Sequence, residues 1–286
     1  MDYKVGSDLS LTRFLLNISQ EELARKISIE RITLLRIENN ETNPSLKTLD
    51  QIYSYIYEKG ININQIKADF FDEEMITGTL LLHGSKSEIQ GDISPFVGRK
   101  SSDFGQAFYA GESVEQTTSF VTNFENSCLY ILEFNEKGLK RYDFDVNQEW
   151  MLAVAYFRGT LEKYKNHPKI QNIVNKVKCA DYVVAPIADN RMFRIIDQFI
   201  EGLITDEQCQ HCLAATHLGK QYAFLTSKAT SQIKILDRCF ISSKERKEKQ
   251  KIKEHDGELS ENKVKESMRS FRNKGKYIED ILDETN

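Results

Sequence analysis

Ionisable side chains follow a buried strand predicted in the second half of this 286-residue sequence. Asp189 and Arg191 come directly after the apolar run 180–187 (ADYVVAPI). Loops at strand ends often carry functional groups, because the scaffold holds them in place. A carboxylate there could orient a ribose or an acceptor, and the Arg191 guanidinium has the planar fork that fits a pyrophosphate. The ordinary alternative is a helix-capping Asp189 and a surface Arg191.

A histidine and a tyrosine lie on two further segments. The run 79–85 (TLLLHGS) predicts another buried strand, which ends in polar residues that include His83. Tyr109 closes the segment 103–109 (DFGQAFY). Taken alone, His83 is more often a strand-end histidine with a structural hydrogen bond, and Tyr109 is more often a core residue. Only their combination with other motifs favours a site.

Cys209 and Cys212 share one face of the predicted helix 206–217. A closed zinc site takes four ligands, and only the distant Cys239 and His217 could complete this one. We therefore expect no metal site and predict buried thiols. The odd number of cysteines, five, fits reduced thiols better than a disulfide framework.

Three consecutive helices are predicted near the N-terminus. Ser19 caps the first, with Glu22 at the third position, as a capping box requires. The second covers 30–38 and ends at Asn39-Asn40, since Asn tolerates the left-handed conformation that ends helices. The third covers 45–57, with an apolar face at helical spacing.

These helices resemble the Cro/repressor helix-turn-helix family, through the runs SQEELA (19–24), IENN (37–40) and NPS (43–45). The resemblance implies that the second helix of the motif enters the major groove of DNA. The residues that it assigns to DNA are Arg31, Ile32 and Arg36, which would face the groove, and Gln20 and Asn39, which would meet phosphates or base edges.

Two departures from that family concern the turn and the charge. Ser28 stands where a glycine is usual. Residues 1–66 hold eight Lys and Arg against nine Asp and Glu. Counterion release supplies most of the affinity for DNA, so this balance predicts weak binding unless a homodimer doubles the contacts. The alternative is a helix-turn-helix that contacts only protein.

Between residues 79 and 241, strands and helices are mixed without a regular alternation. Predicted strands are 79–85, 128–134, 180–187, 220–225 and 233–241. Predicted helices are 114–120, 150–161, 190–201 and 206–217. Neither G-x-G-x-x-G nor a P-loop occurs, so Rossmann and P-loop folds lack support. The pattern predicts an α+β domain.

Four segments of this domain, in order, resemble a bacterial family grouped with the ADP-ribosyltransferase superfamily. They are LLHGS (81–85), DFGQAFY (103–109), DYVVAPIADNRMF (181–193) and QYAFLTSKA (221–229). The resemblance implies an ADP-ribosyltransferase fold and NAD⁺ as co-substrate. It also implies transfer of ADP-ribose with loss of nicotinamide. One branch, which includes diphtheria toxin, uses a His-Tyr-Glu set on three separate segments.

In that set, His83 takes the first place and would hydrogen-bond a ribose. The Gly84 backbone would approach the nicotinamide amide closely, where a side chain would obstruct, and Ser85 is counted with the NAD⁺-binding residues. Tyr109 would stack on the nicotinamide ring. Gln221 takes the third place, where Glu is common, and it cannot offer negative charge to an oxocarbenium-like transition state.

The resemblance adds Asp189 and Arg191 to the NAD⁺-binding residues. It favours an enzyme: a toxin or phage-defence effector with a DNA-binding domain, an acceptor that is protein or nucleic acid, and a neutralising antitoxin partner. The alternative is a non-enzymatic DNA-binding regulator that senses NAD⁺ or a related nucleotide, which Gln221 favours. A weaker alternative is a protein-interaction module such as an antitoxin.

Composition indicates the remaining organisation. We expect a helix-turn-helix domain at 1–68, the α+β domain at 69–242 and a charged tail at 243–286, either a solvated helix or disordered. A short apolar stripe near the end, Tyr277 to Leu282, could dock on the body or on a partner. There is no apolar run that could span a membrane and no signal-peptide core, so we expect a cytoplasmic protein.

Overall fold

The computed structural model describes residues 2–215 and 219–283, which form two compact units. Unit 1 consists of 2–90, 113–134 and 234–253. Unit 2 consists of 91–112, 135–233 and the chain from 254 onward. Within the described part of the chain, no helix is both long and apolar enough to cross a membrane.

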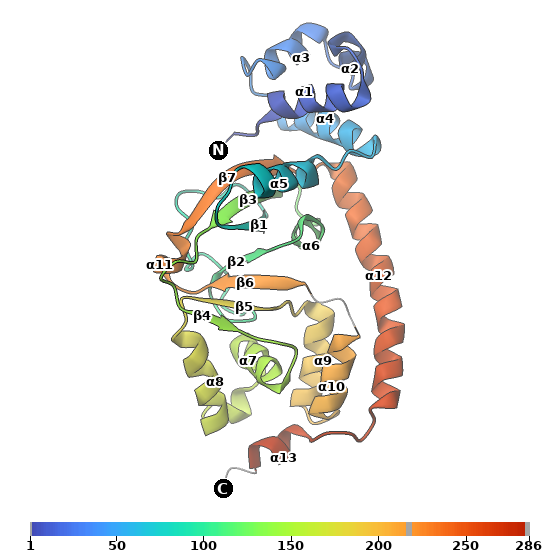
Figure 1. Cartoon of the computed structure of the whole chain (residues 1–286). Helices are drawn as coiled ribbons and strands as arrows, with labels where there is room; N and C mark the ends of the chain where they lie inside the picture. The colour runs from blue at the N-terminus through green and yellow to red at the C-terminus, as the bar shows by residue number, and fades with distance from the viewer. Residues whose placement is uncertain (1, 216–218, 284–286) are drawn as a thin grey trace. The chain divides into compact units, whose positions relative to one another are not determined.

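Five helices open unit 1 (Figure 1). They are α1 (Val5–Leu16), α2 (Gln20–Lys26), α3 (Arg31–Glu38), α4 (Leu46–Glu58) and α5 (Ile63–Glu74). The predicted cap is present, since Ser19 Oγ accepts the Glu22 N–H at 3.1 Å. Ser45, which was predicted as the first residue of its helix, is also a cap, and its Oγ accepts the Thr48 N–H at 3.2 Å. Each cap satisfies a backbone donor that the helix leaves unpaired, so these residues determine where α2 and α4 begin.

Left-handed backbone residues end several of these helices, among them Asn17 after α1, with φ = 52°. Asn40 has φ = 58° after α3, as predicted for this position. Ser28, in the turn between α2 and α3, also has φ = 58°. The turn therefore demands the conformation that glycine adopts without strain, and Ser28 adopts it at a cost.

The apolar faces of α1–α4 close around Leu23, Leu34 and Ile52, which are almost fully buried. Phe240 joins the same core and packs on Tyr53, with ring centroids 5.3 Å apart. Because Phe240 ends strand β7, the core of the helical segment includes part of the sheet region of unit 1.

A buried ion-pair cluster joins α1, α5 and β7. Lys67 Nζ lies 3.2 Å from Asp8 Oδ2 and 2.8 Å from Asp237 Oδ2. Tyr53 Oη donates to Asp8 Oδ2 at 2.6 Å. Burial raises the pKa of the Asp8 carboxyl above its ordinary value, although Lys67 acts in the opposite direction.

Unit 1 also holds strands β1 (Thr79–Ser85), β3 (Cys128–Phe134) and β7 (Ile233–Phe240, in this unit from Lys234), in the order β1-β3-β7. β1 and β3 are antiparallel, with Leu81 opposite Leu132. Helix α6 (Val114–Ser119) contacts both of these strands. The three strands confirm the predicted segments to within one residue at each end.

Among its described residues, unit 2 has four strands in the order β4-β5-β6-β2. They are β4 (Arg141–Asp143), β5 (Tyr182–Pro186), β6 (Lys220–Phe224) and β2 (Phe108–Gly111). The first pair is parallel and the other two are antiparallel, so the strands are mixed. The pattern of strands and helices confirms the α+β class.

The helices of unit 2 are α7 (Gln148–Arg158), η1 (Glu162–Tyr164), α8 (Pro168–Lys178), α9 (Asn190–Ile200), α10 (Asp206–Ala214) and α11 (Ser227–Thr230). Trp150 and Phe199 are fully buried between them. Helix α8 and the short strands β2 and β4 were not predicted from the sequence. Residues 216–217 of the predicted helix 206–217 lie outside the described residues.

The charged tail is helical. It forms α12 (Ser243–Ser270) and α13 (Ile278–Asp283). Ile278, Ile281 and Leu282 are buried in the core of unit 2, so the apolar stripe docks on the body of the protein. The proposed divisions at 68/69 and 242/243 stay predictions: α5 runs through the first, and both compact units combine separate stretches of chain.

Candidate functional site

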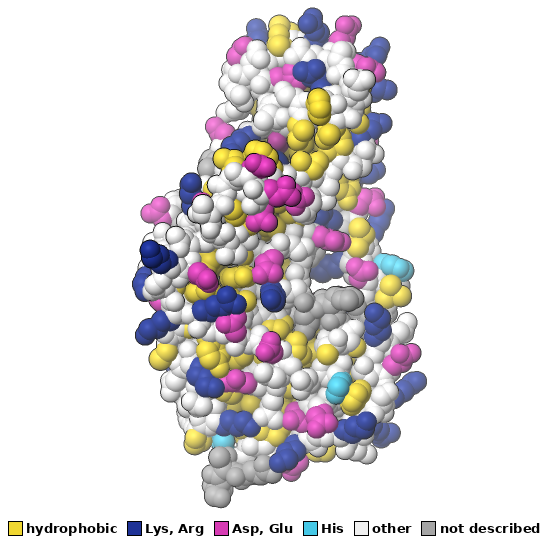
Figure 2. Space-filling model, in the orientation of Figure 1, with side chains coloured by type: hydrophobic (Ala, Val, Ile, Leu, Met, Phe, Trp, Pro, Cys, Tyr) yellow, Lys and Arg dark blue, Asp and Glu magenta, His cyan; other side chains and the backbone are white. Residues whose placement is uncertain are grey.

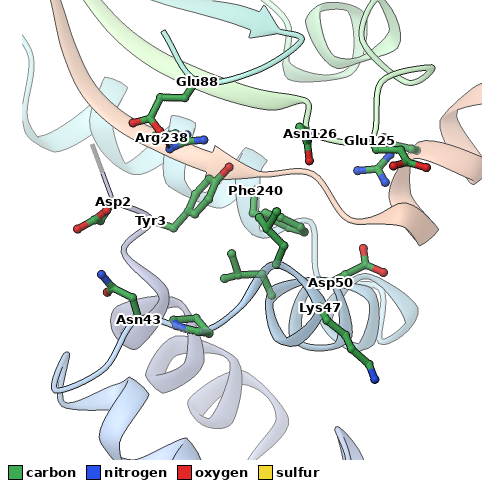
Figure 3. A pocket seen from close by; sticks show the side chains of 14 residues that line it. Asp2, Tyr3, Asn43, Lys47, Asp50, Glu88, Glu125, Asn126, Arg238 and Phe240 are labelled. Carbon is green, nitrogen blue, oxygen red and sulfur yellow. Dashed lines mark ion pairs between the residues drawn. The ribbon is translucent and has the colours of Figure 1, made fainter. Parts of the chain in front are cut away.

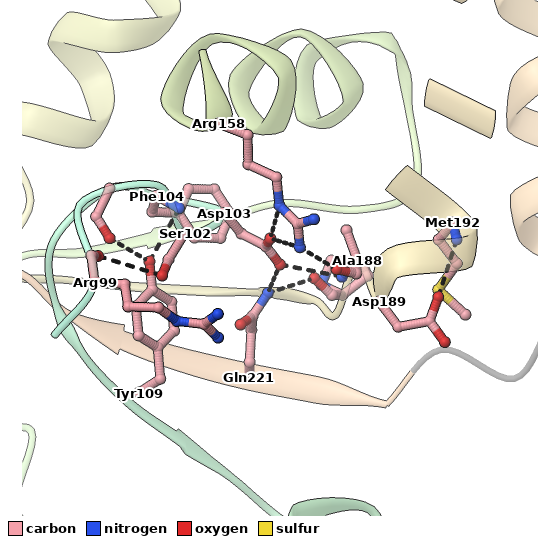
Figure 4. A network of polar contacts seen from close by, with 12 residues as sticks. Arg99, Ser102, Asp103, Phe104, Tyr109, Arg158, Ala188, Asp189, Met192 and Gln221 are labelled. Atoms are coloured by element: carbon pink, nitrogen blue, oxygen red, sulfur yellow. Dashed lines mark hydrogen bonds and ion pairs between the residues drawn. The ribbon is translucent and has the colours of Figure 1, made fainter. Parts of the chain in front are cut away.

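A buried polar cluster centred on Asp103 lies in unit 2 (Figure 4). Asp103 is only 5% exposed. Its Oδ1 accepts from Arg158 Nε at 2.8 Å and from Arg158 Nη2 at 2.5 Å. Its Oδ2 accepts from the Ala188 N–H at 3.1 Å and from Gln221 Nε2 at 2.6 Å. All four bonds go to one carboxylate, which is the condition under which a buried charge is tolerated.

Arg158 reaches this carboxylate from the last turn of α7. Its Nη2 also donates to the Ala188 carbonyl, and its guanidinium lies 4.3 Å from the centroid of the Phe193 ring. The pairing is bidentate on a single oxygen and is backed by an aromatic face, which holds the guanidinium in one orientation. Arg158 therefore connects α7 to the loop between β5 and α9.

Gln221 stands on β6 and is 8% exposed. Its Nε2 donates to Asp103 and also to the Pro186 carbonyl at 3.0 Å. An amide nitrogen has two hydrogens to donate, and both acceptors come from the protein itself. A ribose hydroxyl at this position could therefore be met by the Gln221 carbonyl oxygen.

Tyr109 stands on β2, opposite Ala223 of β6. Gln221 is two residues from Ala223, so Tyr109 and Gln221 project from the same face of two adjacent strands. Tyr109 Oη donates to the Gly105 carbonyl at 2.9 Å and accepts the Phe104 N–H at 3.0 Å. Burial raises the pKa of this phenol, so it stays protonated and acts as a donor.

His83, Gly84 and Ser85 end strand β1, which belongs to unit 1, whereas Tyr109 and Gln221 belong to unit 2. His83 is opposite Tyr130 of β3, with ring centroids 6.4 Å apart. Ser85 Oγ donates to the Ser87 carbonyl at 2.6 Å.

Gly84 is required by close packing inside unit 1. A Cβ atom there would lie 2.6 Å from the Thr117 carbonyl oxygen of α6. The helix therefore approaches this strand so closely that only glycine fits. This contact accounts for the glycine by a route that the sequence analysis did not consider.

Asp189 caps helix α9, because its Oδ1 accepts the N–H groups of Arg191 at 2.8 Å and Met192 at 2.9 Å. Arg191 Nη2 donates to Asp189 Oδ2 at 3.3 Å. The Nη1 side of the guanidinium faces helix α12 at Gly257, where a Cβ atom would lie 2.5 Å away. The two predicted cofactor residues are thus paired with each other.

The residues predicted to contact DNA gather on and around α3. Arg31, Ile32 and Arg36 are exposed, and Ile32 is half exposed although it is apolar. Gln20 instead donates to Glu38 Oε2, and Asn39 Nδ2 donates to Glu41 at 3.0 Å. Over the face in Figure 2, basic and acidic side chains are interspersed, in keeping with the nearly neutral charge of the sequence.

A cavity of about 690 Å³ lies within unit 1 (Figure 3). Tyr3 and Phe240 form an edge-to-face aromatic wall, with ring centroids 5.5 Å apart. Arg238 lies 4.3 Å from the Tyr3 ring and pairs with Glu88 at 2.9 Å. The lining mixes both signs of charge, which gives no preference for an anion or a cation.

Cys209 and Cys212 are buried thiols of α10, as predicted. Their Sγ atoms lie 3.7 Å from the Ile195 carbonyl and 3.6 Å from the Val264 carbonyl. Burial raises the pKa of Cys212 to about 11, so the reactive thiolate is disfavoured.

Two family models match the chain. One covers residues 79–235, more than half of the sequence, and is described as a protein of unknown function (DUF3990). The chain belongs to this family. The other covers residues 13–54 and is described as a helix-turn-helix, so the N-terminal part of the chain carries this DNA-binding motif. No curated protein and no solved structure matches the chain.

The polar cluster around Asp103 lies entirely within the DUF3990 domain. The sequence analysis included Asp103 in a motif but gave it no role, and it did not select Arg158. The sequence offered only a weak signal for this pair. Asp103 opens the segment 103–109 and Arg158 lies in a predicted helix, but nothing along the chain indicates that the two residues meet. The structure brings together Asp103, Gln221 and Tyr109, and it adds Arg158.

Proposed function

We propose that this chain binds DNA through α3 and that its DUF3990 domain transfers ADP-ribose from NAD⁺ to an acceptor. The DNA-binding part is supported by Arg31, Ile32 and Arg36, which are exposed together on the second helix of a helix-turn-helix. An exposed apolar side chain between two arginines is costly in water and suits a groove that presents thymine methyl groups and guanine acceptors.

The test of DNA binding compares Arg36→Ala with the wild type on duplexes selected from a random-sequence pool. We expect Arg36→Ala to weaken binding of the selected duplex about tenfold, in line with the loss of one base contact. Lys251→Ala, which removes an equal charge from the exposed surface of α12, is the matched control. Equal affinities for Arg36→Ala and the control would leave the motif as a protein-contact module.

The transferase part is supported by the register of β2 and β6, which places Tyr109 and Gln221 on one face beside the charge-paired Asp103. Tyr109 would stack on the nicotinamide ring, and the Gln221 carbonyl would accept from a ribose hydroxyl. The bond between nicotinamide and ribose C1″ breaks, nicotinamide leaves with the bonding electrons, and the acceptor nucleophile bonds to C1″ and loses its proton.

The test of transfer follows label from adenine-labelled NAD⁺ into protein, RNA and DNA offered separately. We expect label in one fraction, with release of nicotinamide, and loss of both in Tyr109→Ala and Gln221→Ala. Tyr164→Ala, a partly buried tyrosine outside the cluster, is the control. If no fraction is labelled and no nicotinamide appears, the transferase function is wrong.

A second candidate function, a DNA-binding regulator that binds NAD⁺ without cleaving it, is favoured by Gln221. Its amide nitrogen is occupied by Asp103 and Pro186, and it brings no carboxylate to an oxocarbenium-like transition state. Calorimetric titration with NAD⁺ separates the two: a regulator binds NAD⁺ and releases no nicotinamide. The transferase would fit a toxin or phage-defence effector with a neutralising partner.

A further inference from the structure

Two apolar side chains in the DUF3990 domain point into solvent. Phe96 is 66% exposed and Val97 is 84% exposed. They are consecutive, and they lie in the loop that precedes Tyr109 and the Asp103 cluster. A single exposed apolar residue needs no explanation, but a consecutive pair on a loop next to a buried polar cluster indicates a contact surface.

The loop is held in this conformation by hydrogen bonds between its backbone and side chains of the same segment. Gln106 Nε2 donates to the Phe96 carbonyl at 2.6 Å and to the Gly98 carbonyl at 3.0 Å. Ser94 Oγ accepts the Phe96 N–H at 3.2 Å. Any side chain at position 98 would collide with the Ala107 carbonyl oxygen, so only glycine allows the loop to pass there. The exposure of the Phe96 and Val97 side chains therefore belongs to a backbone conformation that is fixed by these contacts.

Two basic residues follow the apolar pair after Gly98. Arg99 and Lys100 are both exposed. Figure 4 shows Arg99 leaving the loop on the side of Tyr109 and Gln221. The next acid along the chain, Asp103, is buried and paired with Arg158, so it does not neutralise them.

We propose that this loop, Phe96 to Lys100, binds single-stranded nucleic acid, with a base stacked on Phe96 and phosphates bound by Arg99 and Lys100. Aromatic side chains beside basic ones are the usual means of binding unpaired bases. A protein partner fits less well, because two apolar residues are far from the area that a stable protein interface buries. The bound strand would also be the acceptor for ADP-ribose. This second part of the inference rests on the proposed function, whereas strand binding does not.

The test measures fluorescence anisotropy of labelled single-stranded RNA and single-stranded DNA with the full chain, without NAD⁺. We expect Phe96→Ala to weaken binding about tenfold, and Phe96→Trp to retain it, since stacking and not bulk carries the contact. Replacing both Arg99 and Lys100 by Ala should reduce the salt dependence by about 1.4 in the logarithmic slope. Comparison of the RNA and DNA arms identifies which strand is preferred.

The control is Phe70→Ala, which removes an exposed phenylalanine from α5, and every variant is also made in an Arg36→Ala background to suppress binding by α3. Equal affinity of Phe96→Ala and the wild type overturns the proposal. Transfer of label to protein alone, unaffected by Phe96→Ala, overturns the role of the strand as acceptor, although the proposed transferase then stands. Loss of strand binding in Phe96→Ala with no transfer to any acceptor supports the loop and removes only the transferase.

Discussion

Gln221 Nε2 lies 2.6 Å from Asp103 Oδ2, so the amide on β6 neutralises no charge but supplies a donor to a carboxylate already paired with Arg158. A glutamate at this place, common in the superfamily that the sequence resembles, would have no hydrogen to donate at neutral pH. It would set a second carboxylate against the first. The choice of Gln at position 221 is therefore tied to the presence of Asp103.

The first prediction concerns Gln221→Glu. We expect this variant to be less stable than the wild type by about 1–3 kcal/mol at neutral pH, because a buried acceptor loses its donor and meets a like charge. The destabilisation should be smaller in acid, because a proton taken up between the new carboxylate and Asp103 restores a hydrogen-bond donor and removes the repulsion. Urea unfolding at several pH values measures both effects. Gln90→Glu, at an exposed site, is the control and should change little.

The second prediction concerns the buried carboxyl of Asp8. Burial raises its pKa in the folded state, so the stability that it contributes is complete below the unfolded pKa and is lost as the pH rises through the folded pKa. Asp8→Asn removes this titration. The free energy of unfolding of the variant, relative to the wild type, should therefore increase as the pH rises from acid to neutral.

Asp8 faces Lys67 from α5, Tyr53 from α4 and Asp237 from β7, so the trend reports on a cluster that these elements share. The control is Asp72→Asn, an exposed carboxyl on α5, which should show no comparable trend. A difference that stays constant over the acid range would contradict the assignment of a raised pKa to Asp8.

The third prediction concerns the turn of the helix-turn-helix. Ser28 has φ = 58°, a conformation that costs an ordinary residue about 1 kcal/mol and glycine almost nothing. Ser28→Gly should raise the thermal midpoint, because relief of this strain adds about 1 kcal/mol of stability. The greater conformational freedom of glycine in the unfolded chain offsets part of that gain. Ser10→Gly, in the middle of α1, is the matched control and should lower stability by about 0.5 kcal/mol, since serine is intermediate between alanine and glycine in a helix.

The fourth prediction concerns Gly257 in the long helix α12. Alanine is better than glycine in a helix by about 1 kcal/mol, but its Cβ would lie 2.5 Å from Arg191 Nη1. Gly257→Ala should therefore stabilise an Arg191→Ala variant by about 1 kcal/mol and the wild type by less. A double-mutant cycle measured by urea unfolding isolates this coupling. Equal effects in both backgrounds would show that Arg191 moves aside freely.

The sequence alone determined the local features of this protein. Ser19 and Ser45 cap helices because a side-chain oxygen three residues ahead of a backbone donor needs no distant partner. Asn40 ends α3 by its own backbone preference. Short runs of apolar residues predicted β1, β3, β5, β6 and β7, because a strand buried on both faces carries apolar side chains at consecutive positions.

Only the tertiary structure decided which distant residues meet. Asp103, Arg158 and Gln221 are separated by 55 to 118 residues, and their bonds depend on where α7 and β6 pack. Gly84 and Gly257 are explained by a carbonyl and a guanidinium that approach from other helices. The strand β4 has three residues and pairs with β5, so its own sequence carries too short a pattern to predict it. Caps and strand preferences depend on residues close in sequence, whereas the partners in a buried polar cluster depend on how distant elements pack.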